Sequence, residues 1–136
     1  MFYTSKDIDK EVITPTARIR LLKNSIIHYT YTSEVEIELP EVEINHKTFV
    51  DFTSLKHPLL IDATGGLVNI SAEGVQFIKS KEPCTPVLGR AFVTTSLANK
   101  LLISINYKIN PSIYPFKVFT NYNEAQAWLL SLINQK

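Results

Sequence analysis

Short runs in which apolar and polar positions alternate or cluster predict the strands of a sheet. Residues 17–22 and 25–31 are rich in β-forming side chains and flank the polar pair Lys23-Asn24. Two such runs around a two-residue break predict a hairpin, in which Asn24 supplies the positive φ of the turn. Residues 34–39 alternate strictly between glutamate and apolar side chains, as in a half-buried strand. Three further short apolar runs predict strands at residues 58–62, 87–93 and 116–120.

Most of the segments between these predicted strands have apolar residues at helical spacing. Pro40 suits the first turn of a helix, and the spacing that follows extends this helix to about residue 53. Ser71 has the chemistry of an N-cap and predicts a second helix behind it. Asn121, with Glu124 three residues on, resembles a capping box before a last helix that carries an unbroken apolar stripe.

The third predicted helix begins after Thr94-Thr95-Ser96, whose hydroxyls suit an N-cap. Its apolar residues follow the i, i+3, i+4, i+7 pattern of a stripe that faces the core: Ala98, Leu101, Leu102 and Ile105. This leaves Ile103, Tyr107 and Ile109 without a place in the stripe. They could form a dimer interface or a lipid-facing patch, or the helix could end early and these residues fold into the core.

The order of these elements predicts an α/β fold. Strands that alternate with helices call for right-handed crossovers and neighbouring parallel strands, and the opening hairpin adds an antiparallel pair. We expect a mixed, mostly parallel five-stranded sheet with about four helices. Residues 1–15 are predicted to form an irregular N-terminal arm, and residues 16–136 a single domain, since 136 residues is an ordinary domain size.

Four stretches, in this order and at this spacing, carry a family resemblance that covers about residues 16–134: Leu59-Leu-Ile-Asp-Ala-Thr-Gly65, Asn69-Ile-Ser-Ala-Glu-Gly74, Ala91-Phe-Val-Thr-Thr-Ser96 with Asn99, and Pro115 to Leu129. The chain resembles the STAS and SpoIIAA-like domains, especially a small bacterial stand-alone branch. The resemblance implies a non-enzymatic binding or regulatory module. It also implies a protein partner or a small ligand, and for this branch a Sec14-like link to lipids.

The same resemblance implies a role for one serine. Alignment on Asp62 and Gly65 puts Ser71 at the phospho-acceptor position of the anti-sigma-factor antagonists, which bind a partner kinase. The surrounding residues depart from that pattern, because Ile70 replaces an acidic residue and Ala72-Glu73 replaces Ser-Gly. This departure argues against the kinase-antagonist role. Ser71 therefore has two interpretations, a phospho-acceptor at a helix N-terminus or a simple N-cap.

Composition and charge narrow the range of partners. A net charge of +1 gives no bulk attraction for nucleic acid. No apolar run approaches the ~18 residues of a membrane span, so we expect a cytoplasmic protein that is not transmembrane. Residues 1–78 carry 7 basic and 11 acidic side chains (net −4), and residues 79–136 carry 7 basic and 2 acidic ones (net +5). This polarity could favour an acidic partner or a homodimer, although solvated surface charge explains it equally simply.

Patterns typical of enzymes and metal sites find little support. Cys84 lies close to two prolines without a marked histidine partner, and His28, His46 and His57 share no ligand spacing. There is no G-x-S-x-G, G-x-G-x-x-G or Walker-type motif. We therefore expect no catalytic residues, no bound metal and no cofactor.

A binding site is predicted at the carboxyl ends of the parallel strands, where open α/β sheets hold their ligands. Together with the start of the Ser71 helix, the proposed ligand or partner contacts are Asp62, Thr64, Gly65, Ser71, Thr94, Thr95 and Ser96. The alternative is that these are only turn and cap residues. A second predicted function is a carrier or sensor of a small apolar ligand or lipid, held in a cavity beneath the helix over residues 96–109.

Overall fold

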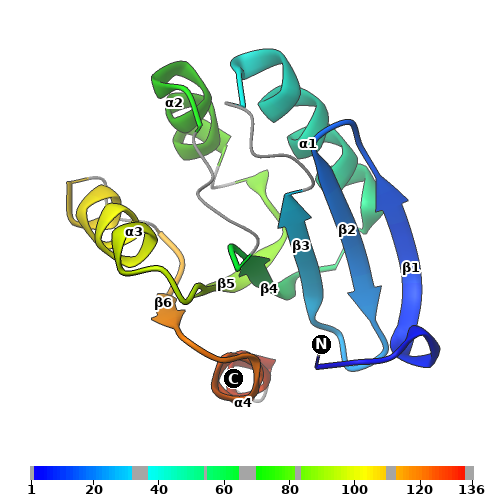
Figure 1. Ribbon diagram of the computed structural model, residues 1–136. Coiled ribbons are helices and arrows are strands. Elements are labelled where there is room, and N and C mark those ends of the chain that lie inside the picture. Colours follow the sequence, from blue (N-terminus) through cyan, green and yellow to red (C-terminus); the bar gives the residue numbers. More distant parts are fainter. Residues whose placement is uncertain are drawn as a thin grey trace.

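The computed structural model describes residues 2–31, 37–53, 55–64, 70–81, 84–109 and 113–133. Within these ranges six strands form one sheet, with four α-helices packed around it (Figure 1). The strands are β1 (Ile8–Ile13), β2 (Ala17–Leu22), β3 (Ile27–Tyr31), β4 (His57–Asp62), β5 (Val87–Val93) and β6 (Phe116–Phe119). The helices are α1 (Leu39–Phe52), α2 (Ala72–Lys81), α3 (Leu97–Ile109) and α4 (Tyr122–Ile133), and a 3-10 turn spans Ser5–Asp7.

The sheet is mixed, as the sequence predicts. Strands β1, β2 and β3 pair antiparallel, whereas β3, β4, β5 and β6 pair parallel. The described sheet has six strands rather than five because Ile8–Ile13, expected to be irregular, forms β1 at its edge. An edge strand contacts a neighbour on one side only, and β1 leaves most of its side chains to solvent. Its sequence therefore lacks the apolar alternation that reveals a half-buried strand.

The opening hairpin is confirmed, but its turn is one residue longer than the predicted two-residue break, so the pairing is shifted by one position. Ala17 pairs with Tyr31 and Leu21 with Ile27, so the strands match along their length. The positive φ, 81°, belongs to Ser25 and not to Asn24. Asn24 instead accepts a hydrogen bond from the backbone N–H of Ile26 through its Oδ1 at 3.1 Å. The short polar side chain thus stabilises the turn without itself adopting the left-handed conformation.

The end of the predicted strand over residues 34–39 belongs instead to the start of α1. Residues 34–36 lie outside the described part, and Ile37 makes a single parallel bridge to Ile70. Glu38 is the N-cap of α1 and Leu39 its first residue, so the strand prediction is wrong at these two positions. A proline in the first helical turn needs no hydrogen-bond acceptor and favours this earlier start. The predicted helix itself is confirmed.

The helices cover the two faces of the sheet unequally. Helices α1, α2 and α3 connect successive parallel strands that advance in one direction, so right-handed crossovers place all three on one face. Helix α4 packs on the other face against β4 and β5 (Figure 1). The first face carries the buried residues Ile19, Tyr29, Phe49 and Leu59, and the second carries Leu60, Ala91, Leu129 and Leu132. No helix in the described ranges is long and apolar enough to span a bilayer.

Helix α3 contradicts the predicted core stripe. Leu101, Leu102 and Ile105 are 53%, 51% and 54% exposed, and Ala98 is exposed as well. Among the α3 side chains that the structure describes, the buried one is the polar Asn99, at 4% exposure. The periodicity correctly predicted a helix, but periodicity alone cannot show whether an apolar stripe faces the core or the solvent.

Candidate functional site

The carboxyl ends of β4, β5 and β6 lie side by side, as the sequence predicts. Asp62 pairs with Val93, and Val93 pairs with Phe119. Beyond the strands, the backbone N–H of Ala63 donates to the Val93 carbonyl at 2.9 Å, and that of Thr94 donates to the Phe119 carbonyl at 3.0 Å. The residues that follow the three strands therefore share one edge, which we call the strand-end rim.

Asp62 is buried at this rim and accepts four hydrogen bonds. Its Oδ1 accepts from the backbone N–H of Thr64 at 3.0 Å and from the Thr64 hydroxyl at 2.6 Å. Its Oδ2 accepts from the Tyr122 hydroxyl at 2.8 Å and from Nε2 of His28 at 2.9 Å. Burial alone would raise the pKa of Asp62, but hydrogen bonds from His28, Thr64 and Tyr122 outweigh it and lower the pKa below its ordinary value. Asp62 is an ionised, internally bonded carboxylate.

The other rim residues divide into buried and exposed ones. Thr94 is buried, and its hydroxyl oxygen accepts from the backbone N–H of Ser96 at 3.1 Å and from the side-chain amide of Asn99 at 3.4 Å. Thr64, Thr95 and Ser96 are exposed. The Ser96 Oγ accepts from the backbone N–H of Asn99 at 3.2 Å, which caps α3. Gly65, also predicted for this site, lies outside the described residues.

Ser71 caps α2, as predicted. Its half-buried Oγ accepts from the backbone N–H of Gly74 at 3.1 Å, and its own backbone N–H donates to the Ile37 carbonyl at 2.9 Å. A Cβ at Gly74 would lie 2.9 Å from methyl groups of Ile70 and Val42, so glycine permits this close packing. These contacts join Ser71 to α2 and to the start of α1, not to Asp62 or Thr94.

A partly buried polar network, which was not predicted from the sequence, connects the rim to the N-terminal segment. Arg20 Nη1 donates to the Tyr3 hydroxyl oxygen at 2.9 Å, and the Tyr3 hydroxyl lies 2.6 Å from Nδ1 of His28. In the tautomer whose proton is on Nε2 and points to Asp62, the Tyr3 hydroxyl donates to Nδ1. Arg20 also pairs with Glu11. The hairpin register of the structure places Arg20 opposite His28, whereas the predicted two-residue turn would place Arg20 opposite Ile27.

Replacing Tyr3 by phenylalanine is expected to lower the free energy of unfolding by about 1 kcal/mol, the typical net value of a hydrogen bond. The substitution keeps the edge-to-face contact between the Tyr3 ring and His28, at 5.3 Å between centroids, but removes the hydroxyl. Urea unfolding of both proteins measures the difference. Because His28 and Arg20 link Tyr3 to Asp62 and Glu11, an unchanged midpoint would show that this network adds nothing to stability.

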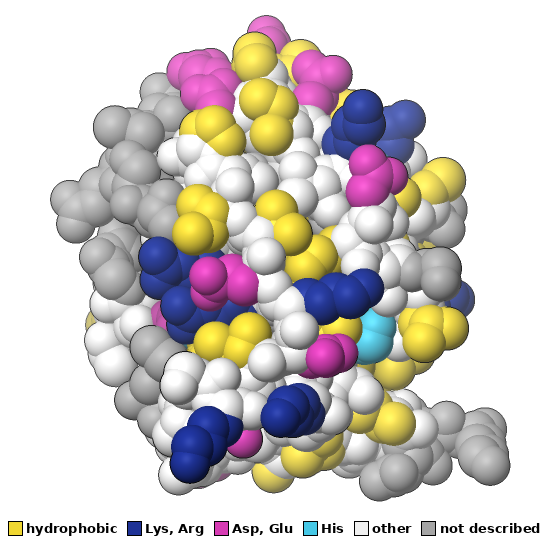
Figure 2. Space-filling view, turned by 90° about the vertical axis from the view of Figure 1, so that its right-hand side faces the viewer, with side chains coloured by type: hydrophobic (Ala, Val, Ile, Leu, Met, Phe, Trp, Pro, Cys, Tyr) yellow, Lys and Arg dark blue, Asp and Glu magenta, His cyan; other side chains and the backbone are white. Residues whose placement is uncertain are grey.

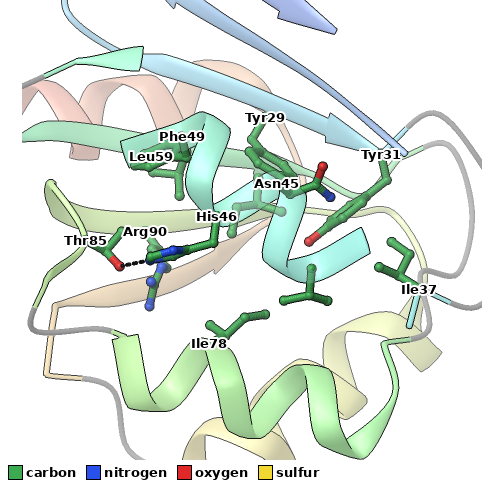
Figure 3. Close-up of a pocket in the computed structure, with 12 residues that line it drawn as sticks. Tyr29, Tyr31, Ile37, Asn45, His46, Phe49, Leu59, Ile78, Thr85 and Arg90 are labelled. Carbon is green, nitrogen blue, oxygen red and sulfur yellow. Dashed lines mark hydrogen bonds between the residues drawn. The ribbon is translucent and has the colours of Figure 1, made fainter. Parts of the chain in front are cut away.

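A cavity of about 100 Å³ lies between α1, α2 and the sheet (Figure 3). Its apolar walls come from β4, from α1 and α2, and from the segment before α1: Ile37, Val42, Phe49, Leu59, Ile61 and Ile78. Its polar lining consists of Tyr29 and Tyr31 on β3, Asn45 and His46 on α1, Thr85 before β5, and Arg90 on β5. The cavity thus combines an apolar body with a polar side built from several elements.

The polar side of this cavity is basic. Arg90 is buried at 5% exposure, and its guanidinium carbon lies 5.5 Å from the centre of the Tyr114 ring. His46 Nε2 lies 3.4 Å from the Thr85 hydroxyl, and burial, then the nearby Lys81 charge, lower the pKa of His46. His46 is consequently neutral at pH 7. None of the described lining residues is acidic, so Arg90 sets the sign of the potential in the cavity.

This cavity is a different one from the cavity predicted beneath residues 96–109, which stays a prediction. Among the described residues, those that line the cavity come from β3, β4, β5, α1, α2 and the segments that flank them, and none belongs to α3. Helix α3 lies at the far end of the sheet from α1, toward β6 (Figure 1). The sequence missed the cavity because its lining residues sit at ordinary core positions, spread from Tyr29 to Arg90.

The geometry defines an α/β domain with a SpoIIAA-like fold, and comparison with solved structures confirms this. The chain superimposes with a TM-score of 0.52 on an uncharacterized protein of the DUF3478 family, with a SpoIIAA-like fold, from Shewanella loihica PV-4. The alignment covers 88% of this chain and 90% of the other, at 11% sequence identity, and so it establishes the fold alone. The predicted resemblance to STAS and SpoIIAA-like domains is thereby confirmed.

The chain belongs to the family described as a domain of unknown function, DUF7793, whose family model matches residues 20–133. No curated protein matches it significantly. The matched region begins in β2 and ends with α4, so it includes both the cavity and the strand-end rim.

Proposed function

We propose that this protein is a non-catalytic binding module that holds a small ligand with an apolar body and an anionic group in the cavity between α1, α2 and the sheet. The observation that carries the proposal is the composition of the cavity lining, where apolar walls face a buried arginine. Small-molecule sites typically combine a mostly apolar lining with a few polar groups that fix orientation.

The size and charge of the cavity narrow the class of ligand. A dry cavity of roughly 150 Å³ accommodates benzene, so about 100 Å³ suits an aliphatic group of a few carbons. A guanidinium attracts an anionic group, so Arg90 favours a ligand that carries a carboxylate. Asn45 lines the cavity too, but its side chain is already bonded to the hydroxyls of Thr14 and Thr16. A short-chain carboxylate therefore fits the lining better than a neutral hydrocarbon of the same size.

The strand-end rim is the second candidate, as a contact surface for a protein partner. The exposed hydroxyls of Thr64, Thr95 and Ser96 support it, since they lie on one edge and remain accessible. The buried Asp62 and Thr94 would then position this edge without touching the partner. Phosphorylation of Ser71 stays a prediction, in which the phosphate would sit at the N-terminus of α2.

Titration with pentanoate, followed by amide chemical shifts in two-dimensional NMR, tests the cavity. We expect saturable shifts that cluster at Tyr31, His46 and Ile78, and weaker shifts with 1-pentanol. Replacing Arg90 by methionine is expected to weaken pentanoate binding about tenfold, because a charge-assisted pair is lost, and to leave 1-pentanol binding unchanged.

A steric block separates binding in the cavity from binding elsewhere. Ile78→Trp adds volume at the α2 side of the cavity and is expected to abolish the pentanoate shifts. Ile44→Trp is the matched control, because Ile44 is 47% exposed on α1 and is not part of the lining. Shifts that persist in Ile78→Trp, or that cluster at Thr95 and Ser96, would contradict the cavity proposal and favour the rim.

A further inference from the structure

The apolar side of α3 faces away from the protein. Leu97, Leu101, Leu102 and Ile105 are 71%, 53%, 51% and 54% exposed. On a helix of 3.6 residues per turn these positions form one stripe, roughly 160° around the axis from Asn99 and Ile103. Asn99 is buried and Ile103 half-buried. An amphipathic helix normally directs its apolar stripe to the core, so α3 has the reverse orientation.

Hydrogen bonds hold α3 in this orientation. The side-chain amide of Asn99 reaches the Thr94 hydroxyl at 3.4 Å and the Ala63 carbonyl at 3.5 Å. Ser96 caps the helix through the backbone N–H of Asn99. Turning the apolar stripe inward would remove these bonds and expose Asn99. The outward stripe is therefore specified by polar contacts at the rim and is not a consequence of loose packing.

The charges around the stripe are basic. The charged residues of α3 are Lys100 and Lys108, and both are exposed. Among the exposed described residues from 84 to 133, Lys117 is also basic, and Glu124 is the sole acidic one. The β1 side of the molecule is different, because Lys, Arg, Asp and Glu side chains are interspersed there (Figure 2). The outward face of α3 thus combines apolar and cationic character.

We propose that this face of α3 lies in the interface of an anionic lipid bilayer, with Leu97, Leu101, Leu102 and Ile105 inserted at the level of the headgroups. A helix with an apolar stripe and flanking lysines has the composition of segments that lie in the membrane plane. Each lysine near an anionic surface adds electrostatic attraction. This proposal is independent of the cavity and assigns α3 a docking role that does not require a bound ligand.

A second copy of the chain fits this face less well. In a symmetric dimer the same patch meets itself, so the lysines of one α3 would approach those of the other. Like charges at an interface disfavour association, whereas anionic headgroups neutralise both lysines at once. Charge complementarity therefore selects the lipid surface, and self-association becomes an outcome that the test must exclude.

Co-sedimentation of the full chain with vesicles tests the proposal. We expect binding to vesicles of equal parts phosphatidylcholine and phosphatidylglycerol, little binding to pure phosphatidylcholine, and weaker binding as salt is raised. The triple variant L101S, L102S and I105S is expected to bind at least about tenfold more weakly, since three apolar side chains no longer insert. Lys100→Glu with Lys108→Glu is expected to remove the preference for anionic vesicles.

Matched substitutions control for a general loss of apolar surface. Ile13 and Ile44 are 60% and 47% exposed on β1 and α1, so I13S with I44S removes exposed apolar side chains elsewhere and should bind vesicles like the parent protein. Circular dichroism confirms that each variant is folded. Failure of the parent protein to bind anionic vesicles would overturn the proposal. Equal binding by the L101S, L102S and I105S variant would also overturn it, as would a dimer in light scattering that this variant abolishes.

Discussion

Replacing Asp62 by alanine is expected to lower the free energy of unfolding by about 3 kcal/mol. The carboxylate accepts hydrogen bonds from Thr64, Tyr122 and His28, and the substitution leaves their donors without an acceptor in a buried site. An unsatisfied buried donor costs more than the hydrogen bond contributed when it was made. Urea unfolding at pH 7, monitored by the fluorescence of Trp128, measures the loss.

A matched substitution isolates the effect of burial. Asp51 is an exposed aspartate on α1, and Asp51→Ala is expected to change stability by less than about 0.5 kcal/mol. If Asp62→Ala were as mild as Asp51→Ala, the Asp62 carboxylate would contribute nothing to the fold. The rim would then have to be held by backbone hydrogen bonds alone.

The same carboxylate predicts an acid-sensitive fold. The folded state lowers the pKa of Asp62, mainly because hydrogen bonds from His28 and Thr64 outweigh the effect of burial. The unfolded chain therefore binds more protons near the unfolded pKa of roughly 3.9, and stability rises with pH there. This contribution is complete above the unfolded pKa and decreases as pH falls toward the folded one. Asp62→Asn should flatten the decline below about pH 4, and an unchanged pH profile would refute this assignment.

The second large effect is expected at Gly89 on β5. A Cβ there would lie 2.4 Å from Cδ1 of Leu132 and 3.2 Å from the backbone carbonyl oxygen of Pro115. Gly89→Val adds three carbons on the face that α4 covers and is expected to cost about 3 kcal/mol through overpacking. Gly89→Ala should cost less, because the end of the Leu132 side chain can move. Thermal unfolding of both variants measures which of them loses more stability.

A double substitution shows whether Leu132 is the cause. Leu132→Ala creates space beside Gly89, so Gly89→Ala should be much better tolerated in that background than in the parent protein. Additive effects in the double variant would mean that the clash with the Pro115 carbonyl dominates instead. That result would locate the constraint at the segment before β6 rather than at α4.

Much of the fold could be predicted from the sequence, because local chemistry and tertiary packing agree at most elements. Residues 87–93 are apolar at both parities, and β5 has strand neighbours on both sides. Asn121 caps α4 through the backbone N–H of Glu124 at 2.8 Å, as its spacing predicts. Strand β1 was missed because an edge strand needs no apolar face. The apolar periodicity of α3 predicted the helix but not which side of it faces the core. That orientation depends on the hydrogen bonds of Asn99 to Thr94 and Ala63.

The candidate site was harder to predict. The strand-end rim could be predicted from the strand order, because the carboxyl ends of neighbouring parallel strands lie at the same edge of a sheet. The sequence could not show that the Asp62 carboxylate accepts hydrogen bonds from His28 and Tyr122. The positions of these two residues depend on the hairpin register and on α4. The cavity depends on how closely α1 and α2 approach the sheet. Residue identities and their spacing do not predict how much space remains between packed helices and a sheet.

The order of strands in the sheet also bears on how the protein acquires its structure. In the described sheet each strand pairs with the strands before and after it in the chain, so a growing polypeptide can add every new strand to an edge that already exists. Helix α4, however, comes last and covers Leu60 and Ala91. Until α4 leaves the ribosome, the nascent chain presents an uncovered apolar surface, and during this interval it is most vulnerable to aggregation and most in need of chaperones.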